Sequence, residues 1–412
     1  MINYISIDGF KSLKNVVIEI KPLTILIGLN SSGKSSVLQF LQILKQTAPA
    51  NYSNLNINGD LIELGTFSDV VFNREEQNTI EFYIGGLRKA SLNPPFGRSI
   101  EYGYSASVDS RGLKKQACDI LSGQVKLSGE YDRQKRSRIE IPLSQGRLFF
   151  DPTYIILRPF NYTTSAGIAE DFDFNNLETF LNVIKDELED FFFVPAIRGV
   201  SSPSYPLDSK SSEDLVDVRN LYQQAIKFSS TVVYQGTDIE NEINKWIRRV
   251  TGITVRGRTI PDKQGAIEAH RKIGVNIVNE GFGSNQLVHL FAQIAMAPQG
   301  GLIGIEEPEV HLHPKAQSEL AKVLAEISQQ EKKNLIIATH SEHILYRLLI
   351  EIAKGNLSPK ELAVYHFKLS DEGITEVEKL TVDEKGKLSK GLPDFFDLDL
   401  EEFKDLLQSL KA

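Results

Sequence analysis

Residues 23–36 read Leu-Thr-Ile-Leu-Ile-Gly-Leu-Asn-Ser-Ser-Gly-Lys-Ser-Ser and decide the fold of this chain. Gly28 to Ser35 match G-x-x-x-x-G-K-[ST], the phosphate-binding P-loop. The apolar run before Gly28 predicts a buried strand, and residues 36–44 have the periodicity of a helix. Glycines let the backbone wrap around an anion, and the N-terminus of the following helix adds partial positive charge. Because a chance match would rarely fall between a strand and a helix, the stretch predicts binding of a nucleoside triphosphate.

The P-loop residues form a backbone cradle and supply two side chains with separate tasks. Lys34 is expected to reach the β- and γ-phosphates, and the hydroxyl of Ser35 is expected to hold Mg²⁺. The expected cofactors are therefore ATP and Mg²⁺. The residues expected to contact the nucleotide are Gly28, Asn30, Ser31, Ser32, Gly33, Lys34, Ser35 and Ser36.

Length and composition limit the class of protein. With 412 residues, 41 % hydrophobic and 24 % charged, the chain has the composition of a globular protein with two or three domains. No apolar run approaches the roughly 18 residues of a membrane span, and the N-terminus lacks the features of a signal peptide. A single cysteine, Cys118, excludes an internal disulfide and a cysteine-cluster metal site. These features predict a cytoplasmic protein without a membrane contact, and the net charge of −8 confines any nucleic-acid surface to a local patch.

Strands and helices alternate at both ends of the chain. Short strand-like segments fill the first part, and buried strands alternate with helices from residue 273 onward, with the helices predicted at 284–297, from Pro314, and at 344–354. This alternation predicts an α/β fold with helices on the faces of a parallel sheet. The predicted organisation is an ATPase domain in two halves, residues 1–85 and 273–370. A β-rich and helical insertion, residues 86–272, lies between the halves, and a C-terminal extension covers residues 371–412.

A second half of the site follows the strand at 302–305. There Leu-Ile-Gly-Ile runs directly into Glu306 and Glu307, the Walker B arrangement, in which a strand delivers carboxylates to the sheet edge beside the P-loop. Glu306 is expected to orient a Mg²⁺-bound water, and Glu307 to polarise the attacking water. The alternative is an ordinary acidic turn after a strand, which the presence of the P-loop makes the weaker interpretation.

Glu306 to Pro314, Glu-Glu-Pro-Glu-Val-His-Leu-His-Pro, resembles the Walker B and D-loop region of ABC-class ATPases of the RecF/SMC-like and OLD-like (overcoming lysogenization defect) group. Four further segments resemble the same group. They are an opening strand (5–13), a signature-like segment (279–286), a switch-histidine strand (336–342) and a Pro-x-x-Arg element (193–198). The resemblance covers both ends of the chain. It implies an ABC-type P-loop ATPase head with a mixed sheet and flanking helices.

The resemblance also implies roles for the matched residues. Gly283, Ser284 and Gln286 would meet the γ-phosphate held by another subunit's P-loop, although only Gln286 aligns cleanly with the Leu-Ser-Gly-Gly-Gln signature. The implied catalytic residues are Glu307, Lys34 and His340, with Glu306 and Ser35 at Mg²⁺. Taken alone, a histidine at the end of a buried strand would more often be a core residue. The implied assembly is a head-to-tail homodimer, or a higher homo-oligomer, that closes around ATP–Mg²⁺ and drives conformational control of a DNA-linked or anti-phage complex.

Several residues keep more than one interpretation. Arg198 is equally compatible with a nucleotide-linked and a structural role, whereas Ser341 is expected to cap its helix. His311 and His313 could bind a metal together with Glu309, but a D-loop role is favoured because the family carries the same His-Leu-His-Pro. No glutamine can be assigned to the Q-loop, and the helix following the P-loop is expected to point its glutamines elsewhere.

Two charged segments lie outside the matched ends. Residues 133–138, Arg-Gln-Lys-Arg-Ser-Arg, could follow a DNA backbone, but a solvated loop is favoured because no aromatic residues interleave. Asp397 and Asp399 resemble the acidic residues of a Toprim nuclease, yet about 70 residues after His340 are too few for another catalytic domain. A nuclease or toxin effector is therefore expected on a partner chain. The competing hypothesis is a largely non-hydrolysing, ATP-bound scaffold that regulates such an effector.

Overall fold

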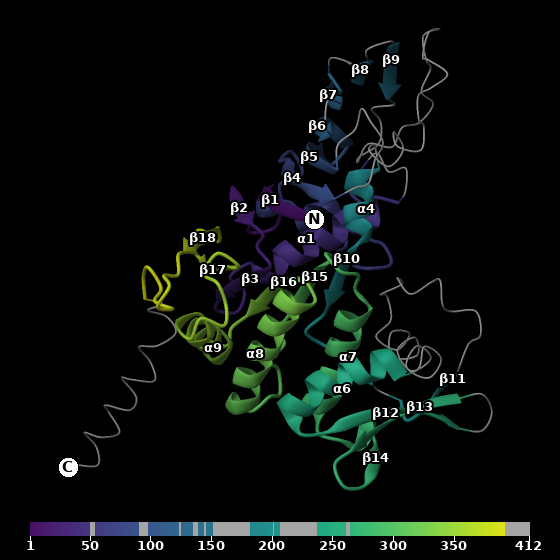
Figure 1. Cartoon of the computed structure of the whole chain (residues 1–412). Helices are drawn as coiled ribbons and strands as arrows, with labels where there is room; N and C mark the ends of the chain where they lie inside the picture. Colours follow the sequence, from purple (N-terminus) through teal and green to yellow (C-terminus); the bar gives the residue numbers. More distant parts are fainter. Residues whose placement is uncertain are drawn as a thin grey trace.

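The computed structural model describes residues 1–49, 54–89, 98–122, 125–134, 139–143, 146–150, 182–200, 202–206, 237–260 and 264–391. In these residues an antiparallel sheet, a central mixed sheet and a small antiparallel sheet follow one another along the molecule (Figure 1). The P-loop lies at the central sheet, so this sheet positions the site.

The central sheet has six strands in the order β10-β15-β16-β3-β17-β18. Neighbouring strands are parallel from β10 to β17, and β18 is antiparallel to β17. Every residue of β3 and β16 is buried, as expected of strands covered on both faces. The predicted α/β fold with a mixed sheet is confirmed. The strands are β3 (Leu23–Gly28), β10 (Phe191–Val194), β15 (Leu302–Glu306), β16 (Asn334–Thr339), β17 (Leu362–Leu369) and β18 (Thr375–Leu380).

Helices pack on both faces of the central sheet. Alternate residues of β3 belong to different cores: Leu26 packs with α1, whereas Ile25 and Ile27 pack with α7, α8 and α9. The helix α6 packs in turn on α7 and α8 (Figure 1). Three helices, α1, α7 and α9, begin two residues before their predicted starts, and α8 begins at the predicted proline. The bounds are α1 (Lys34–Thr47), α6 (Thr237–Thr251), α7 (Phe282–Met296), α8 (Pro314–Gln330) and α9 (Glu342–Ala353).

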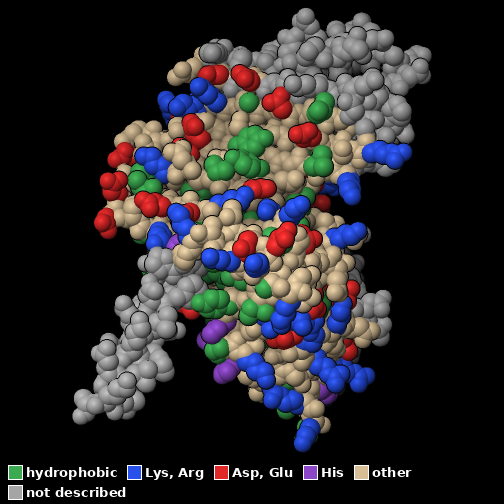
Figure 2. All heavy atoms as spheres, turned by 60° about the vertical axis from the view of Figure 1, so that its left-hand side comes forward, with side chains coloured by type: hydrophobic (Ala, Val, Ile, Leu, Met, Phe, Trp, Pro, Cys, Tyr) green, Lys and Arg blue, Asp and Glu red, His purple; other side chains and the backbone are tan. Residues whose placement is uncertain are grey.

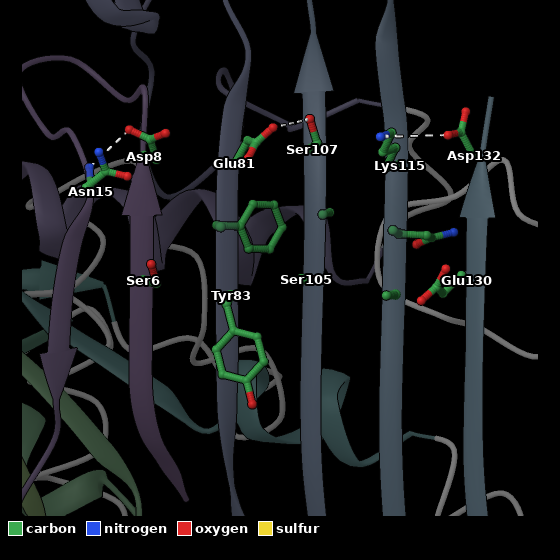
Figure 3. Close-up of a pocket in the computed structure, with 14 residues that line it drawn as sticks. Ser6, Asp8, Asn15, Glu81, Tyr83, Ser105, Ser107, Lys115, Glu130 and Asp132 are labelled. Atoms are coloured by element: carbon green, nitrogen blue, oxygen red, sulfur yellow. Dashed lines mark hydrogen bonds and ion pairs between the residues drawn. The ribbon is translucent and has the colours of Figure 1, made fainter. Parts of the chain in front are cut away.

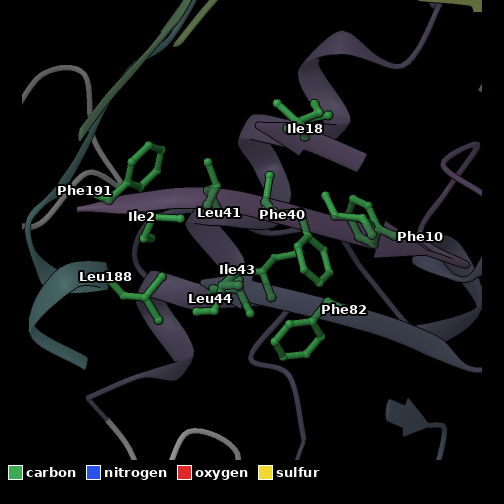
Figure 4. Close-up of a cluster of buried hydrophobic side chains, with 14 of the residues drawn as sticks. Ile2, Phe10, Ile18, Phe40, Leu41, Ile43, Leu44, Phe82, Leu188 and Phe191 are labelled. Carbon is green, nitrogen blue, oxygen red and sulfur yellow. The ribbon is translucent and has the colours of Figure 1, made fainter. Parts of the chain in front are cut away.

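The antiparallel sheet has the order β2-β1-β4-β5-β6-β7, and its inner face packs on α1. Figure 4 shows this contact, in which Phe40 stacks edge-on against Phe10 and Phe82 at centroid distances of 5.1 and 5.4 Å. The outer face borders a hollow of about 820 Å³, which is lined mainly by small, amide and charged side chains together with Tyr83 (Figure 3). The P-loop helix is thus held between two sheets. The strands are β1 (Ile2–Asp8), β2 (Val16–Glu19), β4 (Ile80–Lys89), β5 (Ser99–Asp109), β6 (Gly112–Ser122) and β7 (Val125–Asp132).

The remaining elements are short. The small sheet contains β11 (Tyr205–Pro206), β12 (Thr254–Ile260), β13 (Gln264–His270) and β14 (Gly274–Asn276). A separate hairpin is formed by β8 (Ile139–Leu143) and β9 (Gly146–Phe150). The short helices are α2 (Phe67–Val70), α4 (Val183–Glu189), η1 (Phe72–Arg74) and η2 (Ile277–Asn279).

Strand pairing crosses the domain limits drawn from the sequence. β4 runs through the limit at residue 85, and β10, from the predicted insertion, pairs with β15 in the central sheet. β18 also belongs to this sheet, although it follows the limit at residue 370. The two ATPase halves, the insertion and the C-terminal extension therefore all contribute strands to the antiparallel sheet or to the central sheet. Local periodicity does not reveal such pairing between distant segments.

Two predicted features fall beyond the described part of the chain. Residues 135–138 of the basic segment, and both Asp397 and Asp399, lie outside the described residues. Within the described residues, no helix combines the length and apolar character that a membrane crossing needs.

Candidate nucleotide site

The P-loop joins β3 to α1, as the sequence predicts. Gly33 has a φ of +99° and Ser31 a φ of +63°, so the loop turns through the left-handed region. A Cβ on Gly28 would lie 2.3 Å from the carbonyl oxygen of Phe367 in β17, which leaves room only for glycine. Asn30, Ser31 and Ser35 are exposed, whereas Ser32 and Ser36 are buried. The loop backbone is therefore fixed by the neighbouring strand while its outer surface remains open.

Lys34 folds over the P-loop. Its ammonium group donates hydrogen bonds to the carbonyl oxygens of Gly28 (2.8 Å) and Leu29 (2.7 Å), and only 5 % of the residue is exposed. Burial lowers the pKa of Lys34, and the nearby carboxylates of Glu307 and Glu309 oppose this shift. The ammonium lies inside the loop, where phosphate oxygens could replace the carbonyl oxygens as acceptors.

Glu306 lies at the end of β15, across β16 from the P-loop strand. Its carboxyl group forms a hydrogen bond with Ser35, and its Oε1 is buried with no partner among the described residues. Burial raises the pKa of Glu306, and the hydrogen bond with Ser35 opposes this shift. A hydroxyl and a carboxylate oxygen are hard ligands of the type that Mg²⁺ prefers, so the residues fit that ion.

Glu307 and His340 form an ion pair at the ends of adjacent strands. Nδ1 of His340 contacts the Glu307 carboxylate, and the His340 side chain is 49 % exposed. The hydrogen bond with Glu307 raises the pKa of His340, against an opposing effect of burial. Burial alone would raise the pKa of Glu307, but hydrogen bonds with His340 and Glu309 lower it overall. The structure therefore brings together two of the residues that the resemblance implies to be catalytic, Glu307 and His340.

Glu309 joins this pair, and not His311 and His313, with which the sequence offered it as a less favoured metal ligand. Ligand atoms of Glu307, Glu309 and His340 lie within 4.8 Å of one another, and His311 and His313 do not belong to this group. Two carboxyl groups and an imidazole from two neighbouring strand ends therefore meet at this point of the sheet edge. Motif spacing does not predict this grouping because Glu309 and His340 are far apart along the chain.

Arg198 binds the backbone of the Walker B acids. Its guanidinium group donates to the carbonyl oxygens of Glu306 (2.9 Å), Glu307 (3.2 Å) and Pro195 (2.8 Å). The residue is 3 % exposed, and burial lowers its pKa to about 10. Of the two interpretations drawn from the sequence, these contacts support the structural one.

The second half of the signature-like segment, residues 283–286, is buried. Gln286 is 2 % exposed and lies beside Gly199, while Gly283 and Ser284 are buried at the start of α7. The side chain of Gln286 therefore does not reach a surface that a second subunit could approach, contrary to the expectation from the signature. Phe282 is 56 % exposed, and its ring meets that of His311 edge-on at 4.8 Å.

Sequence analysis did not predict a role for Lys11 near the site, and it did not predict the contact of Gln39. Lys11 donates a hydrogen bond to Gln39 (2.6 Å) and interacts electrostatically with Glu306. Gln39 is thus linked to Glu306 through Lys11, although the glutamines of this helix were expected to point elsewhere. The available signals were the position of Lys11 in the opening Phe-Lys-Ser and the separation of one helical turn between Ser35 and Gln39. As predicted, Ser341 caps α9 by accepting a hydrogen bond from the N–H of Ile344 (3.2 Å).

A family model described as "AAA domain, putative AbiEii toxin, Type IV TA system" matches residues 23–345, from the P-loop strand into α9. The chain belongs to this AAA ATPase family. The match confirms the class of ATPase that the motifs suggested. The closer assignment to OLD-like proteins stays a prediction.

Solved SMC head domains are similar to this AAA ATPase. An SMC head bound to the C-winged helix domain of ScpA is 15 % identical, with a TM-score of 0.48 over 93 % of this chain and 98 % of that chain. The SMC head domain from Thermotoga maritima is 12 % identical, with a TM-score of 0.44 over 92 % and 99 %. A head with an extended coiled coil, bound to the C-terminal domain of ScpA from Pyrococcus furiosus, is 13 % identical, with a TM-score of 0.47 over 100 % and 99 %. No curated protein sequence matches the chain.

Proposed function

We propose that this AAA ATPase binds ATP with Mg²⁺ and hydrolyses it. The supporting observation is the convergence of two pairs, Ser35 with Glu306 and Glu307 with His340, at strand ends beside the P-loop. Lys34 would hold the β- and γ-phosphates, and Ser35 and Glu306 would hold Mg²⁺ and its water. Glu307 would accept a proton from the attacking water.

The ion pair between Glu307 and His340 suggests how ATP would start its own hydrolysis. His340 is a half-exposed side chain whose pKa is raised by Glu307, which favours the imidazolium form. A γ-phosphate would compete with Glu307 for this cation. Moving His340 to the phosphate would leave Glu307 free to act as a base.

The same ion pair also favours the competing function. While His340 occupies Glu307, the carboxylate is not available to water, and an ATP-bound protein in this arrangement would hydrolyse slowly. Such a protein would serve as a scaffold that holds an effector. Phosphate release by the wild-type protein, measured with Mg²⁺ and with EDTA, distinguishes an enzyme from a scaffold.

Replacing Lys34 with alanine tests nucleotide binding directly. Lys34→Ala is expected to weaken ATP binding by about tenfold or more, because it removes the charged donor inside the P-loop. Binding would be measured with a fluorescent ATP analogue. Lys14→Ala removes an exposed lysine outside the P-loop and is the control. Equal affinities of Lys34→Ala and the wild type would contradict the proposed site.

A head-to-tail homodimer around ATP is the assembly that we propose, with Gly281, Phe282 and His311 facing the other subunit. These residues surround the exposed start of α7, where an uncovered aromatic ring favours association. The dimer would be measured by light scattering in the presence of ATP and Mg²⁺, in a protein that also carries Glu307→Gln. In this background Phe282→Glu is expected to weaken the dimerisation affinity by about 30-fold or more. Ile273→Glu, at another exposed apolar residue, is the control. A dimer unaffected by Phe282→Glu would exclude this surface.

The cellular role that we propose is conformational control of a DNA-linked or anti-phage complex, with a nuclease or toxin on a partner chain. Lys and Arg side chains gather on the lower part of the face in Figure 2, whereas acidic side chains surround a hydrophobic patch on its upper part. The outer face of the antiparallel sheet is lined by Asp8, Glu81, Glu130 and Asp132, with one lysine, Lys115, among the lining residues. A DNA contact would therefore lie on the lower part, near α6 and the small sheet.

A further inference from the structure

Glu309 is a buried acid beside the candidate site, and the proposed function gives it no task. It follows Pro308 in the turn after β15, and only 3 % of the residue is exposed. Burying a carboxyl group is costly unless the group is hydrogen-bonded, paired or protonated. The contacts of Glu309 show how this cost is offset.

One oxygen of Glu309 fixes the backbone at the end of β16. Oε1 accepts hydrogen bonds from the backbone N–H of His340 (3.1 Å) and from the hydroxyl of Thr339. The Thr339 hydroxyl oxygen accepts in turn from the N–H of Ser341 (2.9 Å), the residue that caps α9. A single carboxyl group therefore joins the end of the strand, the histidine and the start of the next helix.

The same carboxyl group contacts Glu307. A carboxylate oxygen of Glu307 and one of Glu309 lie within 4.8 Å of each other. Two carboxyl groups this close can share a hydrogen bond only when one of them carries a proton. Oε2 of Glu309 is buried without a donor among the described residues. Burial, followed by the charge of Glu307, raises the pKa of Glu309 to about 7, whereas the pKa of Glu307 is lowered, so a proton shared by the two favours Glu309.

The other charged groups around Glu309 come from three further elements. Nδ1 of His340, after β16, lies 3.7 Å from Oε1. Lys34 of α1 and Arg198 of the segment after β10 interact with Glu309 electrostatically. A proton on Glu309 leaves Glu307 as the single negative partner of His340 within this trio.

We propose that Glu309 is a positioning residue, which holds His340 through its backbone and orients Glu307 through a hydrogen bond donated by its own neutral carboxyl group. This inference rests on the proposed function, since Glu307 and His340 are the groups positioned. If Glu309 lost its proton, a second negative charge would stand beside Glu307 and the donated hydrogen bond would be lost.

Glutamine and alanine variants at this position separate a neutral donor from an anion. The amide of Glu309→Gln can accept from the His340 N–H and donate to Glu307, so we expect kcat within about threefold of the wild type. Glu309→Ala removes both contacts and is expected to lower kcat by about 10- to 100-fold, with KM for ATP within about twofold. Glu351→Gln, at a buried acid of α9 paired with Arg347, is the matched control and should leave kcat unchanged.

The pH profile supplies a readout that a merely structural role would not move. Wild-type kcat should fall as pH rises through about 7, because Glu309 then loses its proton. This step should be absent in Glu309→Gln, which keeps only the fall that follows deprotonation of His340. A Glu309→Gln variant as slow as Glu309→Ala would overturn the proposal, as would an alanine variant as fast as the wild type. If the alanine variant does not fold, the pH profile of the glutamine variant decides.

A measurement without ATP distinguishes failure of this proposal from failure of the proposed function. In ¹⁵N-histidine NMR titrations, assigned with His340→Gln, the pKa of His340 should fall in Glu309→Ala and stay unchanged in Glu309→Gln. This difference would support the positioning role even if the wild type hydrolysed no ATP. Identical titration of His340 in the wild type and Glu309→Ala would overturn it, whatever the turnover.

Discussion

Glu307→Gln is expected to lower the rate of ATP hydrolysis by about 100-fold or more, while ATP remains bound. Glutamine keeps the size of the side chain but cannot accept a proton from water. The pairs Ser35–Glu306 and Lys34–P-loop are left in place, so nucleotide binding should persist. The measurements are phosphate release and the amount of nucleotide retained after gel filtration.

Glu319→Gln is the matched control for this loss of charge. Glu319 lies on α8, away from the P-loop, and pairs with Arg249 at 2.9 Å. Its replacement should leave turnover within about twofold of the wild type. Equal, slow turnover of the wild type and Glu307→Gln, with ATP bound by both, would favour the scaffold over the enzyme.

Arg198→Met is expected to destabilise the protein by about 3–5 kcal/mol. Methionine fills part of the space but donates no hydrogen bond, so the carbonyl oxygens of Glu306 and Glu307 would lose their buried partner. The guanidinium charge that offsets the neighbouring carboxylates would also be lost. Urea denaturation followed by circular dichroism measures the change in the free energy of unfolding.

Arg249→Met provides the comparison at a solvent-facing arginine. Arg249 forms salt bridges with Glu319 and Glu326, and all three side chains are about one-third exposed. Such pairs contribute about 1 kcal/mol or less, so this variant should be nearly as stable as the wild type. Similar losses for the two variants would mean that Arg198 does not anchor the Walker B turn.

Local sequence predicted the P-loop, the strand before it and the helix after it. The glycine pattern sets a left-handed turn at Gly33, and apolar periodicity sets the flanking elements, so both depend on neighbours along the chain. The same holds for Glu306 and Glu307 at the end of a buried strand. These features do not require knowledge of distant contacts.

The errors of sequence analysis concern residues whose partners are distant. Gln286 matched a signature position, but its burial beside Gly199 depends on how α7 packs on the segment after β10. Glu309 was considered only as an alternative metal ligand with its sequence neighbours His311 and His313, and its place beside His340 was missed because that place depends on the parallel pairing of β15 and β16. Motif spacing records neither contact.

The sequence by itself determined that this protein has a P-loop, a Walker B strand and an α/β head, because conformational preference and periodicity are properties of short segments. Only the tertiary structure decided that β10 completes the central sheet, that Arg198 binds the backbone of the Walker B acids, and that Glu309 joins Glu307 and His340. The physical reason is that hydrogen bonds and burial between distant segments arise from packing and leave no repeating signal in the chain.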